Sequence, residues 1–312
     1  MNLTSALHRA CQQHPEKTAL VCEGRRLSYA AWKDRSARLG AVLQARGVVA
    51  GDRVALWGAG SEHYLIAYTA LWWIGAVACP VNTRWSAAEI AFSLRDCGVR
   101  CLIVDADTAP LTTALRDQVP DLNDVLLLGP MREGDRGAGA TPLAPLMDSA
   151  APALDGRYGG TALAALLYTG GTTGRAKGVM LSHANLMSAA LARLAATPDM
   201  EASVALLAMP MFHAGSLSRV LPHLIACATG VVLPQFRADA ALDAIESEGV
   251  TDLPLAPTML QTLLDHPAFE PRRLASVRRI GYGAAPIAEP LLERALTALP
   301  WVGFMQIGRA HV

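Results

Sequence analysis

A regular alternation of strand-like and helix-like segments constrains the fold of this chain more than any other feature of its sequence. Short apolar runs, often β-branched, are separated by stretches with apolar residues at helical spacing. In the first half the predicted strands are 53–57, 76–81, 100–104 and 124–128, and the predicted helices are 62–73, 86–96 and 110–118. In the second half the predicted strands are 162–168, 204–208, 230–233, 250–255 and 277–281, and the predicted helices are 184–196, 216–228, 238–248, 257–265 and 288–299. Such alternation predicts an α/β fold with largely parallel sheets covered by helices.

The segment 131–160 interrupts this alternation. It is rich in Gly, Pro, Ala, Asp and Arg and has no apolar periodicity, which is typical of a loop or linker. We therefore expect a first α/β subdomain at 1–130 and a second at 161–306. Ahead of the alternation, the sequence predicts a short helix capped by Thr4, strands at 18–23 and 26–29, and a helix at 30–46.

Composition excludes several classes of protein. The chain has 312 residues, 52% of them hydrophobic, which allows one large core or two modest ones. Its 27 basic and 27 acidic residues leave no net charge, so we expect no nucleic-acid partner. Six scattered cysteines form no metal-ligand pattern and predict reduced thiols. The first residues lack the features of a signal peptide, so we expect a cytoplasmic protein.

The uncharged stretch 64–81 has nearly the length of a membrane span. Gly75 and Pro80 interrupt it, and valines follow Gly75. We interpret it as a buried helix at 62–73 followed by a buried strand at 76–81. Weak peripheral contact with a membrane stays open.

A loop rich in glycine and threonine follows the predicted strand 162–168. Small residues let backbone N–H groups converge on one anion, and hydroxyl groups add further donors. Lys177 is one of only three lysines, with Lys17 and Lys33, and supplies a mobile positive charge. A solvated hairpin turn would explain the glycines but not the paired threonines with a lysine. We predict that the phosphate-binding residues are Thr169, Gly170, Gly171, Thr172, Thr173, Gly174 and Lys177.

The loop differs from a Walker A motif, which runs through Gly-Lys-Ser/Thr directly into a helix. Lys177 lies three residues after Gly174 and is followed by Gly178. Residues 179–181 are strand-like, and only then can Ser182 cap a helix. The sequence therefore predicts a strand-loop-strand arrangement and excludes the ordinary P-loop geometry.

The stretch YTGGTTGRAKGVMLSH at 168–183 resembles the signature loop of the adenylate-forming superfamily, which includes acyl-CoA synthetases, adenylation domains and luciferases. The usual family form has Ser at Gly170 and often Pro at Ala176. The resemblance extends over nearly the whole chain, to about Gln306. Further matching segments follow in the family's order at 15–20, 47–48, 51–55, 75–77, 80–82 and 89–90. The resemblance implies that the chain is the large domain of such an enzyme, without the β-barrel part of that domain and without the small C-terminal domain.

Two further segments resemble family sites. His213, in the segment 209–215, is similar to a histidine beside the acyl and nucleotide pockets, and the resemblance gives it and Lys177 catalytic roles. The segment 282–287 is similar to one that packs against adenine and shapes the acid tunnel. From the residues alone, both segments have structural interpretations as well. The resemblance implies adenine contacts by Gly283, Ala284, Ala285 and Pro286, and an acid pocket of Met211, His213, Leu217, Tyr282 and Ile287. The apolar members favour a fatty or aryl acid over an amino acid.

The family joins a carboxylic acid to ATP, with Mg²⁺, to give an acyl-adenylate that then usually reacts with coenzyme A. Its Mg²⁺ ligand is a glutamate five residues after the position of Gln306. Here the residues after Gln306 are Ile307, Gly308, Arg309, Ala310, His311 and Val312, so we predict no metal ligand, a divergent tail at 307–312 and an incomplete, inactive fragment. Three functions stay open: an acid-CoA ligase, a relative that delivers the acyl group to a carrier protein, and a noncatalytic nucleotide-binding relative. Oligomeric state is not predicted.

Overall fold

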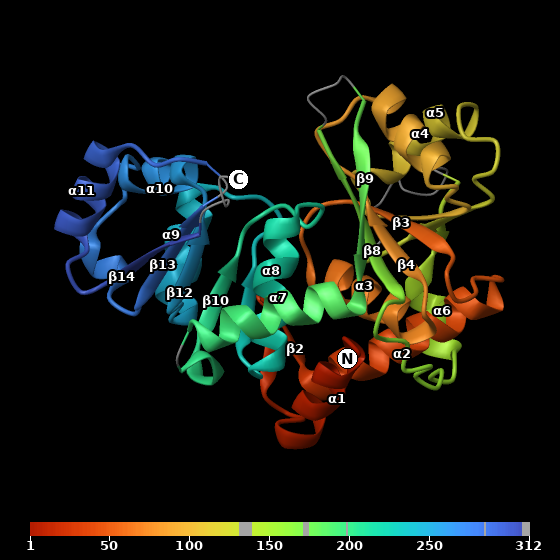
Figure 1. Ribbon diagram of the computed structural model, residues 1–312, viewed down its shortest axis with the longest axis horizontal. Coiled ribbons are helices and arrows are strands. Elements are labelled where there is room, and N and C mark those ends of the chain that lie inside the picture. Colours follow the sequence, from red (N-terminus) through yellow and green to blue (C-terminus); the bar gives the residue numbers. More distant parts are fainter. Residues whose placement is uncertain (131–138, 171–174, 198, 284, 308–312) are drawn as a thin grey trace.

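The computed structural model describes residues 1–130, 139–170, 175–197, 199–283 and 285–307 of the chain. Within these ranges it contains two seven-stranded sheets, which lie beside each other with helices around them (Figure 1). Most strand pairs are parallel, and the antiparallel pairs are β1–β2 and β8–β9. The predicted α/β class with two largely parallel, helix-covered sheets is confirmed.

The first sheet has the strand order β7-β6-β5-β3-β4-β8-β9. Its inner strands are buried on both faces, as expected for parallel strands between helices. The strands are β3 (Arg53–Trp57), β4 (Val77–Pro80), β5 (Cys101–Val104), β6 (Asp124–Leu127), β7 (Thr141–Pro142), β8 (Leu163–Thr169) and β9 (Lys177–Ser182).

The second sheet has the order β14-β13-β12-β10-β11-β1-β2. Its strands are β1 (Thr18–Cys22), β2 (Arg25–Ser28), β10 (Val204–Leu207), β11 (Thr229–Val232), β12 (Asp252–Leu255), β13 (Arg279–Gly283) and β14 (Gly303–Ile307). The opening hairpin β1–β2 thus joins the second sheet, and the hairpin β8–β9 joins the first. Each sheet therefore contains strands from both of the predicted ranges, 1–130 and 161–306. The boundaries of the two subdomains stay a prediction.

Four of the helices that the structure describes begin at a serine cap. Ser28, Ser61, Ser86 and Ser182 each accept a hydrogen bond from a backbone N–H three residues on. The helices are α1 (Thr4–Gln13), α2 (Tyr29–Ala45), α3 (Glu62–Ile74), α4 (Ala87–Asp96), α5 (Thr113–Arg116), α6 (Leu143–Ser149), α7 (His183–Ala195), α8 (Ala214–Ile225), α9 (Ala238–Glu248), α10 (Pro257–Leu264) and α11 (Glu289–Ala298). Short 3-10 turns are η1 (Ala109–Thr112), η2 (Met200–Ala202) and η3 (Pro271–Leu274).

Two expectations for the first half need correction. The segment 131–160 is not wholly a loop, because its described part contains β7 and α6. Leu143 and Met147 of α6 are four residues apart and both buried, and α6 packs against α2. One helical turn of apolar spacing is too short a pattern to stand out among prolines and alanines. The predicted helix 110–118 is also shorter, since η1 occupies its start and α5 ends at Arg116.

Helix α3 is buried on every side, which explains why the stretch 64–81 is so apolar. Gly75 ends it in the left-handed conformation at φ 76°, and β4 follows inside the first sheet. The predicted buried helix and strand are confirmed. Among the described helices, none combines the length and apolarity that crossing a bilayer requires. All six cysteines are free thiols, five of them buried.

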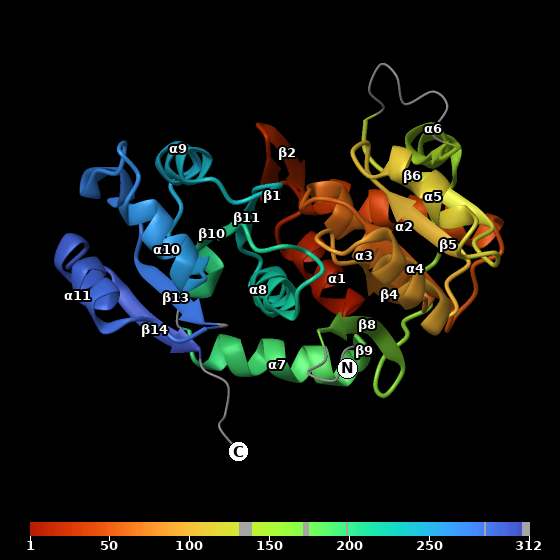
Figure 2. The ribbon, with the colours of Figure 1, turned by 90° about the horizontal axis from the view of Figure 1, so that it is seen from above.

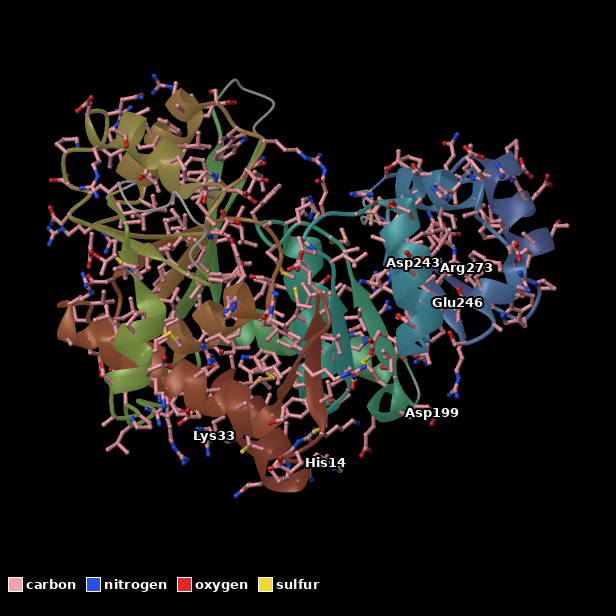
Figure 3. All side chains as sticks on the ribbon, turned by 180° about the vertical axis from the view of Figure 1, so that it is seen from behind. His14, Lys33, Asp199, Asp243, Glu246 and Arg273 are labelled. Atoms are coloured by element: carbon pink, nitrogen blue, oxygen red, sulfur yellow. The ribbon has the colours of Figure 1, made fainter. Side chains whose placement is uncertain are left out.

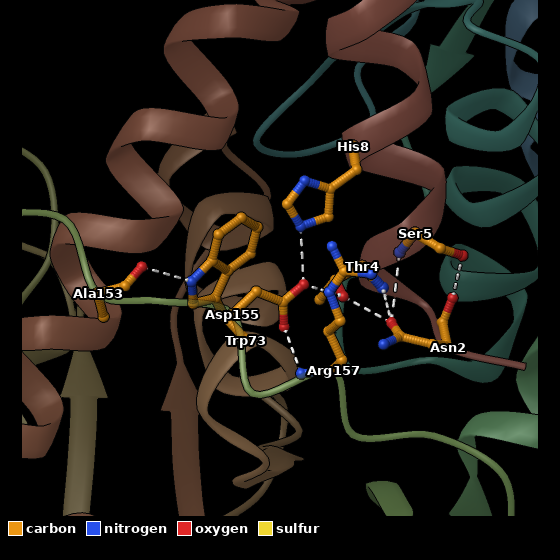
Figure 4. A network of polar contacts seen from close by, with 8 residues as sticks. All are labelled: Asn2, Thr4, Ser5, His8, Trp73, Ala153, Asp155 and Arg157. Carbon is orange, nitrogen blue, oxygen red and sulfur yellow. Dashed lines mark hydrogen bonds and ion pairs between the residues drawn. The ribbon is translucent and has the colours of Figure 1, made fainter.

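A polar network fixes the start of the chain (Figure 4). The buried carboxylate of Asp155 accepts hydrogen bonds from Thr4 Oγ1 at 2.7 Å and from the backbone N–H of Arg157 at 2.8 Å, and it lies 2.8 Å from His8 Nε2. The His8 ring stacks on Trp73 of α3, and Trp73 Nε1 donates to the carbonyl of Ala153. Helix α1 is thus attached both to α3 and to the connection that leads to β8.

Within the second sheet's helical layer, Arg273 bridges to α9 (Figure 3). Its guanidinium group lies 2.6 Å from Asp243 Oδ1 and 2.7 Å from Glu246 Oε2. On the other face of this sheet, α7 runs from the edge near β14 toward the β8–β9 hairpin and packs against α8 (Figure 2). Helix α7 therefore links the two sheets.

Candidate nucleotide and acid site

The loop at 169–177 is held by the antiparallel strands β8 and β9. Thr169 pairs with Lys177 and Tyr168 pairs with Gly178, so the strand-loop-strand arrangement is confirmed. Lys177 is exposed at the start of β9. A Cβ atom on Gly178 would meet Leu166 Cδ2 at 2.7 Å, so a larger residue here would require the end of the Leu166 side chain to shift. Gly171, Thr172, Thr173 and Gly174 lie outside the described residues.

The loop end of this hairpin packs against α4 and the segment before it. The Tyr168 hydroxyl donates to the Asp96 carboxylate, and its ring meets Trp85 edge to face at 6.2 Å between centroids. Burial, followed by the hydrogen bond to Asp96, raises the pKa of Tyr168 far above its usual value. Arg175 lies 5.6 Å from the ring centre of Phe92, within cation–π range. These contacts join residues distant in sequence, and no local pattern signalled them.

His213 lies at the N-cap of α8. Its Nδ1 accepts a hydrogen bond from the backbone N–H of Gly215 at 3.2 Å, and the imidazole is exposed. A neutral imidazole that accepts at Nδ1 carries its proton on Nε2. The ring is therefore oriented by its own helix, with Nε2 as its donor. The start of α8, the end of β14 and the β8–β9 hairpin lie on the same upper side of the molecule (Figure 1).

Met211 and Leu217 are buried, with 1% and 2% of their surface exposed. The Met211 carbonyl accepts from the Tyr68 hydroxyl at 3.1 Å, and its sulfur accepts from Ser216 at 3.0 Å. The first contact fixes the segment before α8 against α3, and the second fixes it against α8 itself. Leu217 belongs to the core between α8 and the rest of the molecule, whereas Met211 also lines a cleft.

This cleft has a volume of about 580 Å³ and lies where strands of both sheets end. The loops after β3, β4, β5, β10 and β11 line it, together with α10. Its walls include Gly60, Arg84, Asp105, Phe212, Phe236 and Thr262. Ligands of α/β proteins bind beyond the carboxyl ends of the strands, and this volume is typical of small-molecule sites. Of the predicted acid-pocket residues, only Met211 contributes to it.

The segment at the end of β13 is divided between two faces of the second sheet. Tyr282 is buried and, by strand alternation, lies on the same face as Ile280, which packs among α9, α10 and α11. Ile287 packs against that same cluster. Gly283 faces the opposite side, and Ala285 and Pro286 are exposed. Ala284 lies outside the described residues. Tyr282 and Ile287 are therefore not brought together with Met211 and Leu217.

The described residues do not form a metal site. In the part of the chain that the structure describes, no group of three or more His, Cys, Asp or Glu side chains is arranged to hold a metal ion. The position of the family's glutamate falls in 308–312, outside the described residues. We therefore assign no step of the chemistry to Mg²⁺.

Two largely parallel, helix-covered sheets with a cleft where their strands end define an α/β protein with a ligand site at that edge. The profile of the family described as AMP-binding enzyme matches residues 7–307. The chain therefore belongs to the AMP-binding, adenylate-forming family of acid-CoA ligases. Members of this family use ATP and coenzyme A.

Individual relatives agree with this assignment. The chain is 34% identical over 316 residues to a feruloyl-CoA synthase from Amycolatopsis sp, covering 97% of this chain and 61% of the relative. It is 31% identical to the fatty acid–[acyl-carrier-protein] ligase ScoC from Streptomyces coeruleorubidus, covering 95% of this chain and 55% of the relative. An inhibitor-bound crystal structure of the N-terminal domain of FACL13 from Mycobacterium tuberculosis matches with a TM-score of 0.86 at 29% identity, covering 100% of this chain and 76% of that one. The chain thus spans 55% to 61% of the length of these two curated relatives.

Proposed function

We propose that the protein containing this chain activates a carboxylic acid with ATP and transfers the acyl group to coenzyme A. The single observation that carries the proposal is the β8–β9 hairpin, which carries Thr169, Gly170 and Lys177 beside its loop. The hairpin belongs to a chain that matches the AMP-binding family over residues 7–307. The cleft of about 580 Å³ and the oriented ring of His213 support it.

The proposed chemistry has two steps. A carboxylate oxygen attacks the α-phosphorus of ATP, the bond to the β-phosphate breaks, and acyl-adenylate and pyrophosphate result. The sulfur of coenzyme A then attacks the acyl carbon, its proton is released, and AMP leaves with the oxygen that bridged the two groups.

The residues of this chain would supply alignment and positive charge. Two anions must meet in the first step, so Lys177 would neutralise charge on the phosphates while N–H groups of the hairpin hold them. His213 would donate its Nε2–H to the acid carboxylate and fix its direction of attack. The phosphate contacts of Gly171 to Gly174 and the adenine contacts of Gly283 to Pro286 stay predictions from the resemblance.

A carrier protein is the second candidate acceptor, because one relative at 31% identity is an acyl-carrier-protein ligase. Both candidates share the adenylation step and differ only in the thiol that accepts the acyl group. A fatty or aryl acid is the substrate class that the apolar Met211, which lines the cleft, favours.

The test uses the complete protein that contains this chain. It is incubated with ATP, Mg²⁺ and a panel of fatty, aryl and dicarboxylic acids, and acyl-adenylates are detected by mass spectrometry. Coenzyme A and a phosphopantetheinylated carrier protein are then added in parallel, and we expect a thioester with coenzyme A. Absence of an adenylate with every acid, despite ATP binding, would favour a noncatalytic nucleotide-binding protein instead.

A further inference from the structure

The segment 83–96 contacts both the cleft and the β8–β9 hairpin. Thr83 and Arg84 line the cleft. The ring of the next residue, Trp85, meets the ring of Tyr168 on β8 edge to face. One short stretch of chain therefore joins the wall of the cleft to the hairpin.

The loop end of the hairpin extends past its neighbour in the first sheet. Within the described residues, β8 is in register with β4 at Ala165 and Ala78, whereas it stays paired with β9 as far as Thr169 and Lys177. Strand β9 lies at the edge of this sheet. The pairing with β4 therefore does not reach the last pairs of the hairpin, and other contacts must set where its loop end lies.

Helix α4 lies beside this end of the hairpin and contacts it twice (Figure 1). Asp96 accepts a hydrogen bond from the hydroxyl of Tyr168, which precedes the loop. Phe92 has the guanidinium group of Arg175, two residues before Lys177, at 5.6 Å from its ring centre. Phe92 and Asp96 are four residues apart and therefore share one face of α4. That face contacts the chain at both ends of the loop.

The contact between Tyr168 and Asp96 is charge-assisted. Burial and, after it, the hydrogen bond to Asp96 raise the pKa of Tyr168 far above its usual value, so the hydroxyl keeps its proton and donates at neutral pH. Hydrogen bonds that involve an ionised group are roughly twice as strong as those between neutral groups. The hairpin is thus held at this point by more than ring packing.

Helix α4 is itself firmly placed. The backbone N–H of Ser86 donates to the Glu89 carboxylate at 2.8 Å, and the N–H of Glu89 donates to Ser86 Oγ at 3.4 Å, which forms a capping box. Ile90 and Leu94 are each 1% exposed and anchor the opposite side of the helix in the core. The hairpin is therefore attached to a fixed element.

We propose that α4 positions the phosphate loop for ATP, with Asp96 and Phe92 as positioning residues that act through Tyr168 and Arg175. This rests on the proposed use of ATP and deepens it, because it names residues outside the loop on which ATP binding depends. A site that is already in place does not lose binding free energy to ordering when the ligand arrives. Loss of either contact should therefore weaken ATP binding without changing how the acid is held.

The experiment uses the complete protein that contains this chain, with ATP and Mg²⁺ varied together at a saturating concentration of an acid that it activates. The variants are Asp96→Ala, Phe92→Leu and the control Asp117→Ala, which removes an exposed carboxylate at the end of α5. We expect the KM for ATP to rise about tenfold in the two α4 variants, with kcat and the KM for the acid changed less than about twofold. Asp96→Asn keeps an acceptor for the Tyr168 hydroxyl and should restore most of the ATP affinity. Asp117→Ala should change none of these values.

Hydrogen exchange of backbone amides, followed by mass spectrometry without ATP, gives a second readout that needs no activity. Asp96→Ala should speed exchange in peptides from β8 and β9, because the hairpin then opens more often. Peptides from the buried helix α3 should change much less and serve as the internal reference. Equal acceleration in α3 and in the hairpin would mark a general folding defect and contradict the positioning role.

Two kinetic outcomes overturn the proposal: an unchanged KM for ATP in both Asp96→Ala and Phe92→Leu, or an equal fall in kcat/KM for ATP and for the acid. If the protein forms no adenylate with any acid, the proposed function fails, and calorimetric binding of ATP with Mg²⁺ decides the present proposal. Weaker ATP binding in Asp96→Ala, together with faster exchange in the hairpin, supports the role of α4. Unchanged ATP binding contradicts it.

Discussion

Thr169 of β8 and Lys177 of β9 face each other as the last paired residues of their antiparallel hairpin. The pairing fixes both ends of the intervening loop and sets Lys177 at its mouth. The position of Lys177 depends on the register of β8 and β9, whereas the lysine of a Walker A loop is positioned by the helix that follows it. The hairpin is in turn attached to α4 through Tyr168 and Asp96.

Replacing Lys177 with Ala should weaken the phosphate-dependent step. Loss of one charge-assisted contact corresponds to about 1.5–3 kcal/mol, or roughly 10- to 100-fold in kcat/KM for ATP. Steady-state kinetics of the complete protein with ATP as the varied substrate provide the measurement. Lys33→Ala, on α2 and well away from the hairpin (Figure 3), is the matched control and should leave ATP kinetics unchanged. Equal ATP kinetics in Lys177→Ala and the unaltered protein would contradict the role of the loop.

Replacing Tyr168 with Phe should loosen the attachment of the hairpin's loop end to α4. The hydroxyl that donates to Asp96 is lost while the ring keeps its contact with Trp85. We expect the free energy of unfolding to fall by about 1 kcal/mol. A double-mutant cycle with Asp96→Ala, measured by urea denaturation, should show that the two changes are not additive. Additive effects would mean that the hydrogen bond contributes nothing.

Replacing Asp155 with Ala should destabilise the N-terminal attachment more strongly. The carboxylate is 4% exposed and joins Thr4, His8 and Arg157. Removal of a buried charged acceptor with several donors should lower the free energy of unfolding by about 3 kcal/mol. Denaturation of the variant beside Asp148→Ala, an exposed aspartate on α6, gives the comparison. If both variants unfold at the same denaturant concentration, the network in Figure 4 has little energetic role.

His183 should make folding stability depend on pH. Its ring is fully buried at the start of α7, neither ring nitrogen has a partner among the described residues, and burial lowers its pKa to about 4. The unfolded chain, with a histidine pKa near 6.5, binds the proton more tightly. The contribution of this neutral ring is therefore complete above about pH 6.5 and is lost as the pH falls toward 4, up to about 3 kcal/mol.

Denaturation of the unaltered protein and of His183→Leu between pH 4 and 7 tests this dependence. The variant should show a flatter pH profile, and His266→Gln should keep the original slope. Identical slopes in His183→Leu and the unaltered protein would rule out His183 as the source.

The fold was largely predictable because buried parallel strands such as β3 and β4 are short continuous apolar runs. The buried helix α3 is a longer apolar run, and an amphipathic helix such as α8 has apolar residues at helical spacing. The sequence did not predict that the hairpin β1–β2 joins the second sheet. The pairing of β1 with β11 joins residues about 200 positions apart, and such pairing has no local sequence signal. Helix α6 was missed because its apolar spacing extends over a single turn.

The candidate site was predictable in part. The loop at 169–177 and His213 have local composition and spacing that reveal them. The contacts of Tyr168 with Asp96 and Trp85 have no local signal, since they form only when β8 and α4 pack together. The resemblance implies one acid pocket for Met211, Leu217, Tyr282 and Ile287. Strand alternation instead turns Tyr282 to the other face of β13, and Ile287 packs against the helices on that face.

Transfer of an oxygen isotope tests the proposed chemistry most directly. The complete protein is supplied with an acid that carries ¹⁸O in its carboxylate, with ATP, Mg²⁺ and coenzyme A, and the nucleotide product is analysed by mass spectrometry. Attack of the carboxylate on the α-phosphorus followed by release of AMP predicts one ¹⁸O atom in AMP for each thioester formed. Unlabelled AMP, or ADP together with ¹⁸O in inorganic phosphate, would contradict the proposal that the protein forms an acyl-adenylate.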